Sequence, residues 1–269
     1  MPRDITTSVR RNVDLGHGNW LLEFEAPDLV TEAGPGRFFM IGAPHADTLL
    51  RRPFSACGLP GTFEDGADGS IQILYKVVGA GTAVLASLRS GAALTVLGPL
   101  GKGFTVFDDP SARPVFVAGG IGSAPFPALA AVLRGRGAAP LMLYGARTES
   151  DLPLLPWFRA ACGEVRVTTD DGSAGRKGLV TAELDDLLAG DRVGLRLYAC
   201  GPEPMLRAVA RRALAAAVPC QLSLEAHMAC GFGVCLGCVV PTHTGRWGDG
   251  GYERVCVEGP VMAAESLAW

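Results

Sequence analysis

The stretch Met228-Ala-Cys-Gly-Phe-Gly-Val-Cys-Leu-Gly-Cys-Val-Val240 decides the character of the C-terminal part of the chain, because its three cysteines follow the pattern C-x4-C-x2-C. A fourth cysteine follows after 17 intervening residues, within Arg254-Val-Cys-Val-Glu-Gly-Pro260. Four thiolates with this opening spacing are typical ligands of a plant-type [2Fe–2S] cluster. The interleaved glycines permit positive φ values and bring backbone amides close to sulfur. The predicted cluster ligands are Cys230, Cys235, Cys238 and Cys256.

Zinc and disulfide bonds are the alternatives for these cysteines. Structural zinc usually takes C-x2-4-C pairs at both ends of its site, whereas only Cys235 and Cys238 form such a pair here. Disulfides need an oxidising compartment, and the N-terminus Met1-Pro-Arg-Asp-Ile-Thr-Thr-Ser8 has no apolar signal-peptide core. Eight cysteines without such a signal indicate a reducing cytoplasm and metal ligation. We therefore prefer the cluster to zinc, and zinc to disulfides.

Composition restricts the classes of function. The 269 residues can form one large domain or two to three small ones, and 48% hydrophobic with 19% charged residues is typical of a packed globular protein. The net charge of −3 and the lack of a basic block give little support to nucleic-acid binding. The longest uncharged stretch, 114–133, contains glycines and prolines, so it favours a strand, a turn and a helix over a membrane span.

The first 107 residues have the pattern of an antiparallel barrel or sandwich. Short runs rich in β-branched and aromatic residues are bounded by Gly, Pro and Asp clusters. These expected strands cover 20–25, 37–41, 70–78 and 93–97. A single helix is expected over 82–89, between a threonine cap and Gly91.

The pattern changes at a linker near 108–112, after which strands alternate with helices. Strands are expected at 115–118, 141–144, 165–168 and 195–198, and helices at 126–133, 154–161, 179–188 and 204–217. This alternation predicts a mostly parallel sheet. The predicted domains are therefore 1–107, 108–218 and 219–269.

Three of these strands end in small or polar residues. Gly119-Gly-Ile-Gly-Ser-Ala-Pro125 follows one strand and opens a helix, where amides and the helix dipole favour phosphate. This turn is not the strict G-x-G-x-x-G fingerprint, but Asp170-Asp-Gly-Ser173 and Cys200-Gly-Pro-Glu-Pro-Met205 end two further strands. Together they predict one dinucleotide cleft. The predicted NAD contacts are Gly119, Gly120, Gly122, Asp171, Gly172, Ser173, Gly201 and Pro202.

Two stretches of the β region have the parts of a second nucleotide site. Arg52-Pro-Phe-Ser55 supplies an arginine that can fork onto a diphosphate, followed by a hydroxyl. Leu74-Tyr-Lys-Val-Val-Gly-Ala-Gly-Thr82 combines an aromatic residue, a cation and a glycine turn that enters a helix.

The order of these motifs resembles the ferredoxin–NADP reductase superfamily and, more closely, the electron-transfer subunits of class 1B dihydroorotate dehydrogenases. The resemblance covers essentially the whole chain. It implies a multidomain β + α/β fold: an antiparallel FAD-binding β-barrel, a Rossmann-like NAD-binding domain and a small C-terminal [2Fe–2S] module. The FAD contacts that it implies are Arg52, Pro53, Phe54, Ser55, Leu74, Tyr75, Lys76, Gly81 and Thr82.

The resemblance also implies a function. The family's partner is an FMN-containing catalytic subunit that interconverts dihydroorotate and orotate in pyrimidine biosynthesis, in a heterotetramer with two copies of each subunit. We expect the nicotinamide of NAD(H) near Cys200, and electrons to pass between NAD(H), FAD, the cluster and the partner. The expected location is the cytoplasm.

Some features depart from the family or stay open. Lys76 stands where the family usually has arginine, and lysine lacks the fork. The 17 residues between Cys238 and Cys256 look long for the family; they form either a surface insertion or a partner contact through Trp247. The resemblance favours NAD over NADP, with Arg147, Arg176 and Lys177 as candidates for contacting a 2′-phosphate. The alternatives are a reductase subunit for ferredoxin, sulfite reductase or hydrogenase, and a zinc-stabilised nucleotide-binding module.

Overall fold

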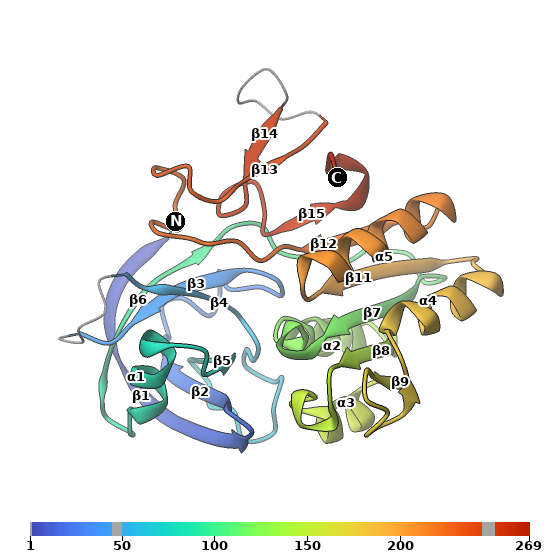
Figure 1. Cartoon of the computed structure of the whole chain (residues 1–269). Helices are drawn as coiled ribbons and strands as arrows, with labels where there is room; N and C mark the ends of the chain where they lie inside the picture. The colour runs from blue at the N-terminus through green and yellow to red at the C-terminus, as the bar shows by residue number, and fades with distance from the viewer. Residues whose placement is uncertain (1, 45–49, 244–250) are drawn as a thin grey trace.

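The computed structural model describes residues 2–44, 50–243 and 251–269 and contains two large sheets (Figure 1). The first sheet is antiparallel, with the strand order β4-β3-β6-β1-β2-β5. Its strands are β1 (Arg3–Gly16), β2 (Asn19–Glu25), β3 (Phe38–Gly42), β4 (Arg52–Ser55), β5 (Ser70–Lys76) and β6 (Ala93–Leu100). Helix α1 (Ala80–Ser87) follows β5.

The second sheet has the order β10-β9-β8-β7-β11-β12-β15, and all of its strands run parallel except β15. Its strands are β7 (Arg113–Gly119), β8 (Leu141–Ala146), β9 (Glu164–Thr169), β10 (Arg176–Lys177), β11 (Leu195–Cys200), β12 (Cys220–Ser223) and β15 (Val261–Ala263). Helices α2 (Phe126–Gly135) and α3 (Leu155–Ala161) pack on one face, and α4 (Val180–Ala189) and α5 (Glu203–Ala215) on the other. The short helices are η1 (Gly120–Ser123), η2 (Glu149–Asp151) and η3 (Ala264–Ser266).

The C-terminal segment is joined to both sheets. Strands β12 and β15 extend the second sheet, with Leu222 opposite Met262. Between them lie the cysteine loop and the hairpin of β13 (Val239–Pro241) and β14 (Tyr252–Arg254). The cysteine loop passes over β3 of the first sheet (Figure 1). The division of the chain at residues 107 and 218 stays a prediction.

Strand β3 has two buried faces. Phe39 and Ile41 belong to the core of the barrel, whereas Phe38 and Met40 share a core with the cysteine loop. Successive side chains of a strand point to opposite faces of the sheet, so β3 is a wall shared by the barrel and the C-terminal segment. This explains why the strand has four consecutive large apolar residues in place of an alternating pattern.

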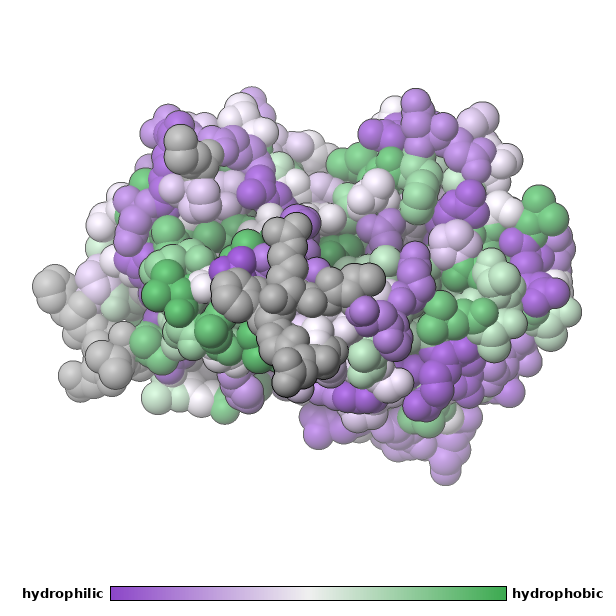
Figure 2. Space-filling view, turned by 90° about the horizontal axis from the view of Figure 1, so that it is seen from above, coloured by the Kyte–Doolittle hydropathy of each residue, from purple (hydrophilic) through white to green (hydrophobic). Residues whose placement is uncertain are grey.

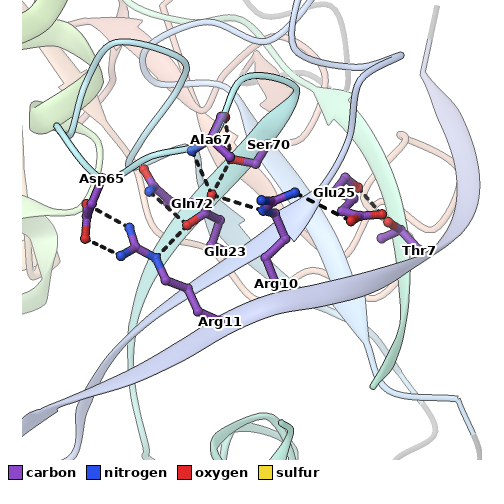
Figure 3. A network of polar contacts seen from close by, with 9 residues as sticks. All are labelled: Thr7, Arg10, Arg11, Glu23, Glu25, Asp65, Ala67, Ser70 and Gln72. Carbon is purple, nitrogen blue, oxygen red and sulfur yellow. Dashed lines mark hydrogen bonds and ion pairs between the residues drawn. The ribbon is translucent and has the colours of Figure 1, made fainter. Parts of the chain in front are cut away.

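A polar network on the outer face of the barrel, opposite to the core residues Leu22 and Phe24, holds the loop between β4 and β5 (Figure 3). The Glu23 carboxylate accepts hydrogen bonds from the Ala67 N–H at 3.0 Å, from Ser70 Oγ at 2.5 Å and from Arg11 Nε at 2.6 Å. Arg11 also donates to Asp65 in the same loop, with Nη2 2.8 Å from Oδ1. The network therefore anchors the loop at three points.

The anchored loop carries a contact between the two lobes. The Phe63 ring lies 5.2 Å from the Trp157 ring, which comes from α3. Cys57, Leu74 and Ala124 belong to the same small core. This core joins the barrel to the second sheet next to the ends of β7 and β8.

We predict that Glu23→Gln destabilises the protein by about 2 kcal/mol at neutral pH, because the change removes the charge that these donors share. Burial alone would raise the pKa of Glu23, but its hydrogen bonds from Ser70 and Ala67 and the charge of Arg11 lower it. The stabilisation is therefore present above the ordinary value of 4.5 and is lost as the pH falls through the lowered pKa. Urea unfolding at neutral and acidic pH measures both effects, with Glu64→Gln in the same exposed loop as the control. Equal stability of the two variants at neutral pH would contradict the prediction.

Candidate cofactor sites

Arg52 and the start of α1 converge as the predicted diphosphate site requires. A Cβ atom added to Gly81 would lie 2.5 Å from Arg52 Nε, so the guanidinium packs directly on the first turn of the helix. The first amides of a helix have no partner within it, and they form the positive end of the helix dipole. Arginine, glycine and free amides together fit a diphosphate group.

The neighbouring residues provide an aromatic surface. The Phe54 ring, half-buried on the edge strand β4, meets the Tyr75 ring at 5.8 Å. The Tyr75 hydroxyl donates to Asn12 Oδ1 at 3.2 Å, and burial raises the pKa of Tyr75 to about 12. Tyr75 is therefore a neutral phenol at physiological pH. Leu74 is buried and packs in the small core with Cys57 and Ala124, not with Phe54 and Tyr75.

Pro53 and Ser55 lie opposite residues of the shared wall. Pro53 pairs with Met40, and Ser55 pairs with Phe38. Directly opposite residues of antiparallel strands place their side chains on the same face of the sheet. The strand that contains Arg52 is thus one strand away from the cysteine loop.

Two of the predicted FAD residues already have other partners. The Thr82 hydroxyl accepts hydrogen bonds from the N–H groups of Val78 and Gly79, at 2.9 and 3.2 Å, and so shapes the turn before α1. Lys76 Nζ forms an ion pair with Asp151 of η2, in the second lobe. The hydrogen bond from Lys76 lowers the pKa of Asp151, so this carboxylate stays ionised. Nothing in the sequence singled out Asp151.

The glycine turn after β7 meets the end of β11. A Cβ on Gly122 would lie 2.5 Å from the Cys200 carbonyl oxygen, and one on Gly119 would lie 2.8 Å from Pro202 Cδ. A Cβ on Gly201 would lie 3.0 Å from the Gly119 nitrogen. The structure thus brings these predicted NAD residues together. Glycine is required there because the two backbones approach so closely. Gly120, with φ +53°, completes the turn into η1.

Asp171 and Ser173 lie elsewhere in the cleft, after β9. Asp171 Oδ1 accepts from the N–H and Oγ of Ser173, at 2.9 and 2.7 Å, and Ser173 Oγ accepts from the Glu149 N–H at 2.8 Å. They line a cavity of about 820 Å³ between the second sheet and the β1–β2 turn. Its further polar lining residues, which sequence reasoning missed, are His17, Asn19, Thr148, Glu149 and Ser150.

Two of the three cationic side chains considered for a 2′-phosphate already form ion pairs with carboxylates. Arg176 Nη1 lies 2.6 Å from Asp186 Oδ2, and Arg147 Nε lies 3.4 Å from Asp151 Oδ2. The aliphatic part of Lys177 packs on Gly172, where an added Cβ would lie 3.2 Å from Lys177 Cβ. The cavity itself is lined by two carboxylates and no lysine or arginine among the described residues. This lining matches ribose hydroxyls better than a phosphate.

Cys200 is a buried thiol at the end of β11. Burial raises the pKa of Cys200 far above its ordinary value, so the group is neutral. The hydroxyl of Ser223, on the neighbouring strand β12, hydrogen-bonds to it. Ser223 was not recognised in the sequence, because its position depends on the pairing of β11 with β12.

The four predicted ligands come together, with two facing the core and two facing out. Cys238 and Cys256 are buried and hydrogen-bonded to each other, whereas Cys235 is exposed and Cys230 is half-buried. Burial first, and then the neighbouring Cys238, raise the pKa of Cys256 to about 12. Such a group needs a metal to hold it as a thiolate.

Backbone amides prepare Cys230 for ligation. Partial burial alone would raise its pKa, but hydrogen bonds from the N–H groups of Cys235, Phe232 and Val234 lower it to about 6. A cysteine loop with several amides directed at sulfur fits an iron–sulfur cluster. In the ranges that the structure describes, no three His, Cys, Asp or Glu side chains are grouped closely enough to hold a single metal ion. Trp247, the proposed partner contact, lies outside the described residues.

An antiparallel barrel, a parallel α/β sheet with glycine-rich strand ends and a four-cysteine loop define an NAD-linked oxidoreductase of the ferredoxin reductase fold. Two family matches agree. Residues 116–211 match the oxidoreductase NAD-binding domain, and residues 225–268 match the iron–sulfur cluster binding domain of dihydroorotate dehydrogenase B.

Known relatives extend the match to the whole chain. The chain is 42% identical to the dihydroorotate dehydrogenase B (NAD⁺) electron transfer subunit of Bacillus caldolyticus over 234 residues, 86% of this chain and 85% of the relative. It is 34% identical over 269 residues to the homologous subunit of Aquifex aeolicus, covering 99% of each. The chain belongs to the family of dihydroorotate dehydrogenase B electron transfer subunits.

A solved structure has the same arrangement. The NADH-dependent reduced ferredoxin–NADP oxidoreductase, studied for flavin-based electron bifurcation, superimposes with a TM-score of 0.82 and 27% identity, over 98% of this chain and 90% of that one. These findings confirm the predicted family, the fold class and the cofactor set of FAD, an iron–sulfur cluster and NAD. The individual contacts to these cofactors stay predictions. No helix among the described residues is long and apolar enough to cross a membrane.

Proposed function

We propose that this chain carries electrons between NAD(H) and an FMN-containing dihydroorotate dehydrogenase subunit in pyrimidine biosynthesis. When bound, FAD exchanges a hydride with the nicotinamide and single electrons with the [2Fe–2S] cluster, while the protein supplies position and electrostatics. One observation carries the proposal: the cysteine loop packs directly on β3, whose neighbour β4 holds the FAD motif. The barrel and the cysteine loop are thus in direct contact.

The described residues have distinct roles in this proposal. Arg52 and the first amides of α1 hold the FAD diphosphate, and Phe54 borders the flavin ring. The glycine turn after β7 lets the NAD diphosphate approach the sheet, and the polar cavity beside Ser173 takes the adenosine end. Cys200, a neutral thiol in a dry position, packs beside the nicotinamide and transfers no proton.

The exposed side of the cysteine loop suits a protein partner. Phe232, Val234 and Leu236 are 52%, 74% and 44% exposed and flank the exposed Cys235. Figure 2 shows hydrophobic residues gathered on this upper face of the molecule. Exposed apolar residues mark surfaces that bind other proteins. Because these residues surround Cys235, the solvent-facing predicted ligand, the catalytic subunit would dock where the cluster is closest to the surface. The proposed assembly is a cytoplasmic heterotetramer with two copies of each subunit.

The test is an anaerobic NADH titration followed by visible absorption, first alone and then with the catalytic subunit and orotate. We expect flavin and cluster bands that both bleach with NADH and recover when orotate and the partner are added. Bleaching without recovery, but with recovery on adding a ferredoxin, sulfite reductase or hydrogenase partner, would support another reductase complex. A colourless protein that contains zinc would support the zinc-stabilised nucleotide-binding module.

A further inference from the structure

We propose that Met40 is the positioning residue that keeps water from the protein-facing side of the iron–sulfur cluster and so sets its reduction potential. This inference rests on the proposed function, because it assumes that the four cysteines hold the cluster. Met40 lies far from the cysteines in the sequence and carries no motif. Its role follows only from the packing of β3.

The contact between Met40 and the cysteine loop is close. A Cβ added to Gly231, the residue after Cys230, would lie 2.4 Å from Met40 Cγ and 2.9 Å from Met40 Sδ. Gly231 also has φ +80°, which side chains other than glycine rarely adopt. The thioether therefore lies against the loop backbone beside a cluster ligand. Leu100 Cδ1, 3.3 Å from the same added Cβ, extends this apolar contact.

Met40 also belongs to the dry side of the site. It is 1% exposed and shares a core with Cys238 and Cys256, the two buried ligands. The opposite side of the loop, with Cys235, is open to solvent. Met40 therefore lies on the face of β3 that packs with the buried ligands, and β3 itself pairs with the strand of the FAD motif.

The physical consequence concerns charge. Reduction adds one negative charge to a cluster that already has four thiolate ligands, and water or polar groups stabilise the more charged state. The apolar shell and solvent exposure of a metal site are known to set its potential. An apolar wall at Met40 therefore holds the potential low, which favours passage of electrons onward over their retention on the cluster.

The experiment compares Met40→Gln with Met40→Leu by potentiometric titration, monitored by EPR of the reduced cluster and by visible absorption. We expect Met40→Gln to increase the equilibrium constant for cluster reduction about tenfold, which corresponds to about +59 mV for a one-electron couple. Met40→Leu, which keeps the volume and the apolar character, should leave the potential near that of the wild type. The FAD potential in the same samples is the internal control.

The possible outcomes distinguish a failure of the role proposed for Met40 from a failure of the proposed function. A wild-type potential in Met40→Gln with full iron content would overturn the role of Met40, and so would an equal shift in Met40→Leu. If Met40→Gln does not fold, Met40→Ala decides, because its cavity admits water at the same place and should raise the potential in the same direction. Absence of iron and sulfide from the wild-type protein would instead refute the proposed function itself.

Discussion

Cys235→Ser is expected to abolish the iron–sulfur cluster while the rest of the chain stays folded and retains FAD. The thiolate is one of the four predicted ligands, and serine is a poor substitute for a soft thiolate donor. The site of the change is exposed, so it leaves no cavity in the core. Iron and sulfide analysis, EPR after dithionite reduction and flavin content are the measurements.

The choice of cysteine makes the result interpretable. Cys238 and Cys256 lie in the core, so their replacement would also destabilise the fold. Cys162→Ser is the control for loss of a thiol outside the loop: Cys162 is buried after α3, so its replacement should cost stability but keep full iron content. Full iron content in Cys235→Ser would remove this residue from the ligand set. We further expect NADH to reduce the flavin of Cys235→Ser while electron delivery to the partner is lost.

Arg52→Ala is expected to weaken FAD binding by about 10- to 100-fold, because a hydrogen bond to a charged group contributes about 1.5–3 kcal/mol. The guanidinium packs on Gly81 at the start of α1, where the diphosphate is expected. Fluorescence titration of the flavin-free protein with FAD measures the affinity.

The neighbouring arginine supplies the control. Arg51 Nη2 pairs with Asp4 Oδ1 at 2.8 Å, away from α1, so Arg51→Ala should bind FAD like the wild type. Gly81→Ala should reproduce part of the loss, because the added Cβ would displace the Arg52 side chain. Equal affinity of Arg52→Ala and Arg51→Ala would place the diphosphate elsewhere.

Much of the fold can be predicted from local sequence. Four strands of the second sheet, β7, β8, β9 and β11, lie within a few residues of their expected positions, whereas β10, β12 and β15 were not predicted. Strand β1 was missed because its 14 residues include five charged ones, and a single residue, Val9, is fully buried. Its existence depends on pairing with β2 and β6, which the local pattern does not reveal.

The candidate site divides in the same way. Gly119 and Gly122 could be identified because a cluster of glycines at the end of a strand indicates a tight turn or a close approach of two backbones. Met40, Asp151 and Ser223 could not, because their positions result from contacts between distant segments. Figure 1 shows why: the cysteine loop, near the end of the chain, lies over a strand from its beginning.

The shared wall of β3 also has a consequence for how the protein is made. Domains generally fold as units from the N-terminus during synthesis. The ribosome produces Phe38 and Met40 early, but the segment that covers them is among the last to emerge. One face of β3 therefore stays exposed to water through most of translation. The nascent chain has an uncovered hydrophobic surface there until the segment around Gly231 has been synthesised. The outer face of β3 is therefore covered only when the C-terminal segment packs on it, whether or not that segment carries its cluster.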